Sequence, residues 1–197
     1  MKHVHVLMIT LICAVLAACA GAPSQPPHTH YGLSADMSQP VRYGAEGLVL
    51  VERVQAEGVI AGRPILKKTG DQPLQLREME GHLWRAAPSA LVQEAVVKSL
   101  SDASQDLSFL PAGIGVTNGD FVLRVALTGF HWDAGAQTAE IAVYATVTRR
   151  KGNALILTKT YRKTASTGTS AGSGVSGLGA ALGLVLDDLA KDLASAL

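Results

Sequence analysis

Alternating apolar and polar positions dominate the second half of the chain. Residues 120–132 and 138–150 carry apolar side chains at every second position, and residues 153–163 are enriched in leucine, isoleucine and tyrosine. A period of two is typical of strands with one buried face. Asp-Ala-Gly at 133–135 and Arg-Lys-Gly-Asn at 150–153 supply turn residues between these stretches. The pattern therefore predicts an antiparallel meander with one apolar and one polar face.

Further strands are predicted in the first half of the chain. Residues 47–54 are mostly apolar and β-branched, which favours an interior strand. Residues 65–68 and 74–77 predict two strands joined by a turn. Pro73 makes the second of these weak or places it at an edge, because proline donates no ladder hydrogen bond.

Helical periodicity appears twice. Apolar residues recur every three or four positions over 88–103, and Pro88 suits the first turn of a helix. After a loop from Ser166 to Gly177, which we interpret as a flexible glycine-serine segment, residues 176–197 show the same spacing. A membrane-surface helix is the alternative for the second, but its polar face is acidic, which disfavours lipid headgroups. We predict an α+β fold: a mainly antiparallel single sheet covered on one face by these two helices. The expected solvent side of the second helix is marked by Asp187, Asp188, Lys191 and Asp192.

The N-terminus has the pattern of an export signal. Lys2 precedes an apolar run from Val6 to Val15, which is too short to span a bilayer at roughly 20 residues. The run ends in Leu16-Ala17-Ala18-Cys19, which resembles the lipobox of bacterial lipoproteins, whose cysteine accepts a diacylglycerol and becomes the first residue after cleavage. An ordinary signal peptide followed by a chance cysteine is the alternative. The sequence predicts lipidation at Cys19, with Leu16, Ala17 and Ala18 as the recognition residues.

Composition divides the remaining chain in two. Residues 19–44 are rich in proline and poor in large apolar residues, which predicts a lipidated flexible tether before a domain at 45–197. The apolar triplet at 31–33 is an alternative start of the folded part. Without residues 1–18 the chain keeps 16 basic and 16 acidic residues, so its charge gives no reason to expect nucleic acid. Cys13 leaves with the signal and Cys19 is lipidated, so no disulfide is expected.

No group of residues predicts catalysis or a bound cofactor. Gly172 to Gly177 fits Gly-x-Gly-x-x-Gly, but the chain ends without the second parallel strand and acidic residue that a dinucleotide site needs. His28 and His30 lack a third metal ligand. His82 and His131 lie beside large apolar residues and are interpreted as structural. Glu78 and Glu80 would share one face of a strand, but solvated charges at a sheet edge explain them equally well. We therefore expect neither enzymatic activity nor a bound metal or cofactor.

The arrangement as a whole resembles the ABC-type transport auxiliary lipoprotein family, which includes paraquat-inducible protein C. The matching features are Cys19, Tyr31-Gly32-Leu33, the strand at 48–54, Ile60-Ala61-Gly62-Arg63, His82 to Pro88 with Trp84 before the proline, Gly119 to Phe130, and the closing helix at 178–197.

The resemblance implies a non-enzymatic role. Such a lipoprotein would serve an ABC transporter and an MCE-domain protein that move lipids or other hydrophobic molecules between membranes. Ala20 rather than aspartate follows Cys19, and this favours a lipid anchor in the outer membrane, facing the periplasm. Homo-oligomerisation stays open. The alternatives are an envelope-assembly or structural lipoprotein with no transport role, and a small secreted hydrolase.

Overall fold

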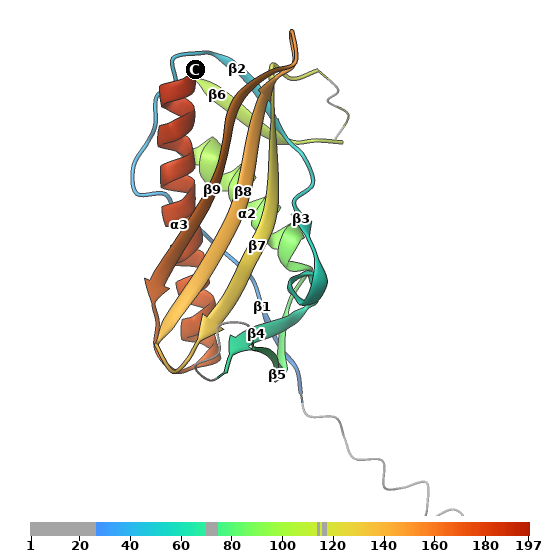
Figure 1. The fold of residues 1–197 in the computed structure, drawn as a ribbon, viewed down its shortest axis with the longest axis vertical. Coiled ribbons are helices and arrows are strands. Elements are labelled where there is room, and N and C mark those ends of the chain that lie inside the picture. Colours follow the sequence, from blue (N-terminus) through green and yellow to red (C-terminus); the bar gives the residue numbers. More distant parts are fainter. Residues whose placement is uncertain (1–26, 70–74, 114, 116–117) are drawn as a thin grey trace, which may run out of the picture.

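The described part of the chain forms one nine-stranded sheet with two α-helices on one of its faces (Figure 1). The structure is a computed structural model that describes residues 27–69, 75–113, 115 and 118–197. The strands are β1 (Thr29–Tyr31), β2 (Gly47–Val51), β3 (Gln55–Ala56), β4 (Pro64–Lys68), β5 (Leu76–Trp84), β6 (Leu107–Pro111), β7 (Phe121–Asp133), β8 (Thr138–Arg149) and β9 (Ala154–Ser166). The helices are η2 (Gly58–Ala61), which is a short 3-10 turn, α2 (Pro88–Ala103) and α3 (Ala171–Ala196).

The predicted meander is confirmed. β7 pairs antiparallel with β8 along its whole length, and β8 pairs in the same way with β9. Gln137 and Asn153, at the two turns, have positive φ angles of 52° and 48°, a conformation that Asn adopts more readily than most residues. These neighbouring strands are joined by short turns, so their pairing follows from local sequence.

The rest of the sheet corrects the prediction of a mainly antiparallel arrangement. The second edge of β7 is shared by the short strands β2, β3 and β4, all of them parallel to it. β2 also pairs parallel with β6, and β1 pairs parallel with β5, whereas β4 and β5 are antiparallel. The sheet is therefore mixed. Parallel partners are joined by long crossovers, such as the one through α2, and their pairing leaves no local sequence signal.

Three strands were not expected, and one expectation about position was wrong. β1, β3 and β6 have few residues and lack a readable period of two. β5 is a nine-residue strand with β1 on one side and β4 on the other, so it is neither short nor at an edge. Pro73, on which that expectation rested, lies outside the described residues.

Helix α2 has the predicted bounds, with Pro88 in its first turn. Helix α3 begins earlier than predicted, at Ala171, so residues 171–177 are its first turns rather than a flexible loop. The side chain of Ser170 caps it by accepting a hydrogen bond from the Ser173 N–H. Among the described helices, α3 alone is long and apolar enough to span a membrane, but most of it is buried against the sheet. It is therefore a core helix of this domain.

The part of the predicted tether that the structure describes is packed rather than flexible. β1 joins the sheet at residues 29–31, and Leu33, Ala35 and Tyr43 are buried in the main core. The predicted boundary at residue 45 is therefore too late, and the folded part begins near the apolar triplet at 31–33. Residues 19–26 lie outside the described residues.

Candidate functional site

The predicted lipidation site lies just before the described part of the chain. Cys19, with Leu16, Ala17 and Ala18, falls outside the described residues. The description starts at Pro27, and the chain enters the domain beside β5 at one end of its long axis (Figure 1). We call this end, formed by β1, β4 and β5, the N-terminal pole. The eight residues 19–26, which precede Pro27, would span at most about 28 Å if fully extended.

Side chains fix the N-terminal pole where the chain enters it. The guanidinium of Arg63 donates from Nε to the Trp84 carbonyl at 3.0 Å and from Nη2 to the Arg85 carbonyl at 3.3 Å. The hydroxyl of Tyr31 lies 2.9 Å from Nδ1 of His82. Trp84 is buried and packs on Phe130. The Tyr31–His82 contact holds β1 on β5, so His82 takes part in a structural contact.

After β1 the chain crosses the helix layer as an extended segment, residues 33–43, which we call the strap. An added Cβ at Gly179 of α3 would lie 2.2 Å from the carbonyl oxygen of Ser34, and one at Gly183 would lie 2.4 Å from that of Asp36. Real Cβ atoms do not approach so closely, so only glycine lets the strap lie on α3 at these positions. Gly179 and Gly183 thus make a close backbone contact between α3 and the strap.

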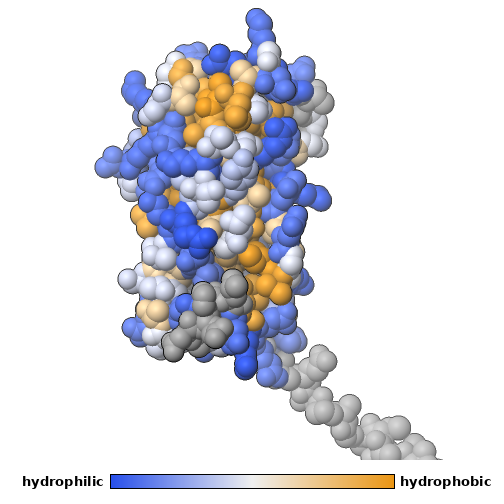
Figure 2. All heavy atoms as spheres, in the orientation of Figure 1, coloured by the Kyte–Doolittle hydropathy of each residue, from blue (hydrophilic) through white to orange (hydrophobic). Residues whose placement is uncertain are grey.

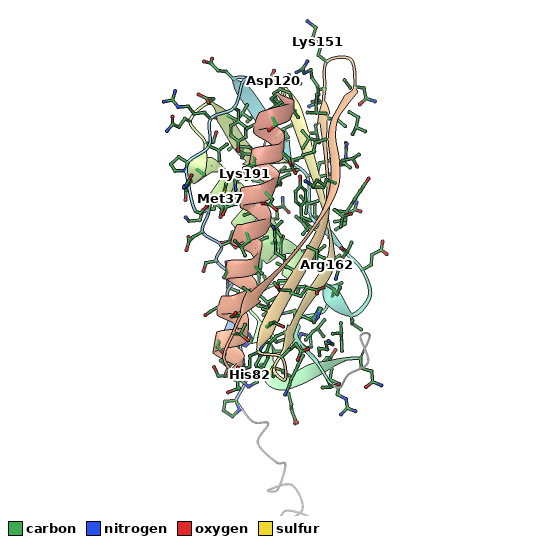
Figure 3. All side chains as sticks on the ribbon, turned by 60° about the vertical axis from the view of Figure 1, so that its left-hand side comes forward. Met37, His82, Asp120, Lys151, Arg162 and Lys191 are labelled. Atoms are coloured by element: carbon green, nitrogen blue, oxygen red, sulfur yellow. The ribbon has the colours of Figure 1, made fainter. Side chains whose placement is uncertain are left out.

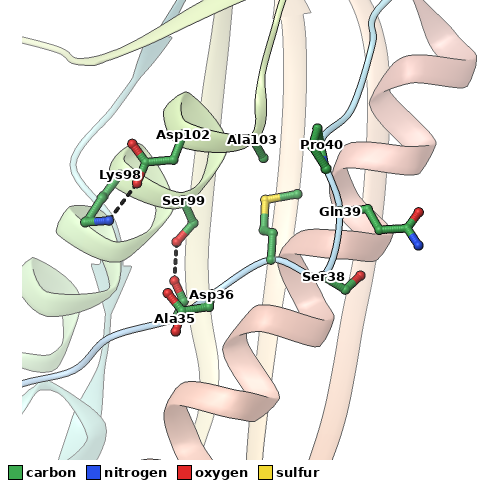
Figure 4. A pocket seen from close by; sticks show the side chains of 10 residues that line it. Ala35, Asp36, Ser38, Gln39, Pro40, Lys98, Ser99, Asp102 and Ala103 are labelled. Atoms are coloured by element: carbon green, nitrogen blue, oxygen red, sulfur yellow. Dashed lines mark hydrogen bonds and ion pairs between the residues drawn. The ribbon is translucent and has the colours of Figure 1, made fainter.

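Polar contacts hold the strap on both helices. Ser99 of α2 donates a hydrogen bond to the Ala35 carbonyl at 2.5 Å, as Figure 4 shows. The Ser38 N–H donates to the Asp187 carboxylate of α3 at 2.9 Å. Asp187 is buried, which corrects its expected place on the solvent side of the helix. Beside the strap lies a cavity of 210 Å³, and an ion pair between Lys98 and Asp102 stands at its rim (Figure 4).

The other sequence candidates are not brought together. Gly174 packs under the Trp132 ring and Gly177 under Thr167 and Ala139, so the chain's own side chains fill the space a nucleotide would need. Within the described ranges no three His, Cys, Asp or Glu side chains gather as metal ligands. Glu78 and Glu80 are exposed on β5.

The titratable groups with shifted pKa values are explained by packing. Burial lowers the pKa of His131, which favours its neutral form. The pKa of Tyr161 is raised by burial and then by its hydrogen bond to Asp192, whose own pKa is lowered by its hydrogen bonds to Lys159 and Tyr161. This group ties β9 to α3, because Lys159 and Tyr161 both donate to the Asp192 carboxylate, at 2.7 and 2.8 Å.

The face of the sheet opposite the helices is open in the described part of the chain. We call it the helix-free face; it is the side turned to the viewer in Figure 1. Tyr144 lies at its centre, 44% exposed, with its hydroxyl 2.8 Å from that of Thr158. Tyr144 is accessible to a partner, whereas Trp84 and Trp132 are buried. The open face is therefore a surface on which a protein partner could dock.

Comparison with known proteins is consistent with this architecture. A search of solved structures found protein XCC0632 from Xanthomonas campestris, a DUF330 protein, with a TM-score of 0.67 at 17% identity, covering 82% of this chain and 92% of that one. An uncharacterised protein has a TM-score of 0.68 at 17% identity, covering 85% of this chain and 99% of its own. Both likenesses show a shared fold.

A search of curated proteins found no match. The model of the ABC-type transport auxiliary lipoprotein component matches residues 31–194, from the end of β1 to the last turns of α3. This span contains nearly all of the described domain, including the strap and the helix-free face. The chain therefore belongs to the ABC-type transport auxiliary lipoprotein family.

Proposed function

We propose that this chain is an outer-membrane-anchored periplasmic lipoprotein and a non-enzymatic auxiliary subunit of an ABC transporter. Its partner in that system is an MCE-domain protein, and the cargo is a lipid or another hydrophobic molecule. The observation that carries the proposal is the family match over residues 31–194, which starts only 12 residues after the predicted lipidation site at Cys19.

The anchor follows from the sequence around Cys19. A thioether-linked diacylglycerol carries two acyl chains, and each buried methylene contributes about 0.8 kcal/mol to membrane binding. Two chains hold a protein firmly, whereas one binds reversibly. Ala20 stands where an aspartate would favour retention in the inner membrane. The chain would then present its N-terminal pole to the periplasmic surface of the outer membrane.

A docking role agrees with the arrangement of the domain. The helices and the strap cover one face of the sheet, and the helix-free face stays open along the long axis (Figure 1). Lys151 and His82 lie at opposite ends of that axis (Figure 3). A domain held by its N-terminal pole would therefore offer the helix-free face and its far end to a periplasmic partner.

The anchor is tested by Cys19→Ala, with Cys13→Ala as the matched control. Cys13 lies in the segment predicted to be removed, so its loss leaves the anchor intact. We expect wild type and Cys13→Ala in the outer-membrane fraction and Cys19→Ala out of it. Mass spectrometry of the N-terminal peptide should show acyl groups on the wild type and on Cys13→Ala, and none on Cys19→Ala. Recovery of the wild-type protein only in the inner membrane would refute the outer-membrane assignment.

The partner is tested by crosslinking in cells that express the transport system. Affinity purification of the full chain should recover the MCE-domain protein, and a crosslinker should give a conjugate of both. Absence of any association, in detergent and after crosslinking, would refute the role in transport. Turnover of an ester or glycan substrate by the purified protein would instead favour the secreted hydrolase.

A further inference from the structure

A row of apolar side chains crosses the helix-free face at the end far from the N-terminal pole. Strand register places Leu110 of β6 beside Leu50 of β2, and Leu50 beside Val122 of β7. Val122 lies opposite Thr148 of β8, which lies opposite Leu155 of β9. Residues paired in this way point to the same face of a sheet. The row therefore runs across five strands, with Thr148 as its only polar member.

The two ends of the row are exposed and its centre is recessed. Leu155 is 60% exposed and Leu110 is 40% exposed, whereas Leu50 and Val122 are buried. Leu50 and Val122 do not belong to the main core cluster, which lies on the helix side of the sheet. Figure 2 shows apolar side chains gathered at the upper end of this face. The row places these two exposed leucines in line with the buried Leu50 and Val122 on one face, and contiguous rather than scattered apolar surface is typical of an interaction site.

Above the centre of the row is a hollow of 490 Å³ with polar walls. Its lining includes Arg124, Glu52, Arg150 and Asn153 around the recessed apolar floor. Arg124 donates two hydrogen bonds to the Glu52 carboxylate, at 2.8 and 2.9 Å, so this pair contributes little net charge. We call the row and this hollow together the distal groove.

The rim of the distal groove is basic. Arg150 and Lys151 lie in the β8–β9 turn, whereas Arg149 is the last residue of β8 and its guanidinium lies over the ring of Phe121, 5.6 Å from the centroid, on the helix side of the sheet. Lys151 projects at the tip of that turn (Figure 3). The nearby carboxylate of Asp120 accepts a hydrogen bond from the Leu48 N–H at 2.9 Å. Two cations in this turn and this carboxylate leave one positive charge in excess at the rim, which favours an acidic partner.

We propose that the distal groove binds an acidic segment of a partner protein, which lays apolar side chains on the row and carboxylates against the basic rim. This assignment rests on the proposed function, so the partner is the MCE-domain protein. The described chain begins at the opposite pole, so the groove lies at the end of the domain far from where the chain enters it. A second copy that docked through the same groove would bring an identical basic rim, and like charges disfavour such a symmetric pairing.

The test measures binding of the purified periplasmic region of the MCE-domain protein to the full lipidated chain in nanodiscs. The groove variant combines Leu155→Asp with Lys151→Glu, two exposed positions at the row and the rim. The control variant combines Leu184→Asp on α3 with Arg77→Glu on β5, which make the same kinds of change at exposed positions away from the groove. Thermal unfolding of both variants establishes that they remain folded.

We expect the groove variant to bind at least about tenfold more weakly, and the control within about twofold of wild type. Binding by the wild type should weaken as the ionic strength rises. Equal binding by wild type and groove variant would overturn the groove while leaving the proposed function standing. No binding by the wild type would overturn the proposed function and this partner with it. Binding of the unlipidated Cys19→Ala protein to phosphatidylglycerol vesicles tests the lipid alternative. If the groove substitutions abolish vesicle binding but leave binding to the MCE-domain protein unchanged, the surface recognises lipid and the protein partner is refuted.

Discussion

Replacement of Gly179 by alanine tests whether the strap depends on direct backbone contact with α3. In an unhindered helix interior, alanine is favoured over glycine by about 1 kcal/mol. Here the added methyl would lie 2.2 Å from the Ser34 carbonyl oxygen, and that oxygen belongs to backbone and cannot rotate away as a side chain would. Overpacking of this kind costs about 1–3 kcal/mol. Because the overlap is severe, we expect Gly179→Ala to lower the free energy of unfolding by a net ~2 kcal/mol.

The matched control is Gly172→Ala in the same helix. No neighbouring atom lies within 4 Å of an added Cβ at Gly172, so only the helical preference applies, and stability should stay the same or rise by up to ~1 kcal/mol. Urea and thermal unfolding of the purified lipoprotein in detergent measure both effects. For a chain of this size, the loss at Gly179 corresponds to a Tm decrease of about 4–8 °C.

Hydrogen exchange then shows where Gly179→Ala acts. The Ser38 N–H, which donates to Asp187, should exchange faster in this variant, because lifting the strap breaks that hydrogen bond. If Gly179→Ala were as stable as Gly172→Ala, with Ser38 equally protected, the close packing of the strap on α3 would be refuted.

Two further predictions concern buried polar groups. Tyr43→Phe should leave stability unchanged or higher by up to ~1 kcal/mol, because the Tyr43 hydroxyl is buried with no hydrogen-bond partner among the described residues. Burial raises the pKa of Tyr43 from 10.0 to about 12, because the folded state favours the neutral phenol. The free energy of unfolding is therefore unaffected by this group below pH 10.0 and falls as the pH rises from 10.0 towards 12, where the phenol ionises first in the unfolded chain. Urea unfolding at rising pH should therefore show a smaller alkaline loss in Tyr43→Phe, and an unchanged loss would contradict this. Asp187→Ala leaves the Ser38 N–H without its acceptor and should cost about 1–3 kcal/mol in urea unfolding, whereas a neutral result would show that this hydrogen bond is dispensable.

Elements defined by local pattern could be predicted from the sequence. Residues 88–103 carry a helical period behind Pro88, and α2 has those bounds. The meander of β7, β8 and β9 also follows from alternation and turn residues. The parallel pairs of β7 with β2, β3 and β4 could not be predicted, since each joins segments far apart in the chain.

The first turns of α3 show why a low-propensity sequence can still be helical. Glycine and serine at 172–177 indicate a loop, because glycine costs about 1 kcal/mol per residue in a helix. The tertiary structure overrides that preference, since Gly174 and Gly177 leave room for Trp132 and Thr167. Asp187 was placed on the solvent side for a similar reason, because its partner on the strap is 149 residues away.

The distal groove could be recognised only in part from the sequence. The basic run at Arg149 to Lys151 is visible in the sequence, but it reads as an ordinary polar turn. Leu50, Leu110 and Leu155 come from three separate segments, and only the strand register brings them into one row. The lipidation site, in contrast, is predicted from a short local motif alone.

The strap packs on α3, so it finds its place only after residues 171–196 have been synthesised. Chains emerge N-terminus first, and segments linked by short turns pair sooner than distant ones. The meander can thus assemble while residues 33–43 still lack the α3 surface on which they lie. A product truncated before Ala171 would leave the inner face of the meander and the strap uncovered. The strap is therefore covered only in chains that have been synthesised through α3.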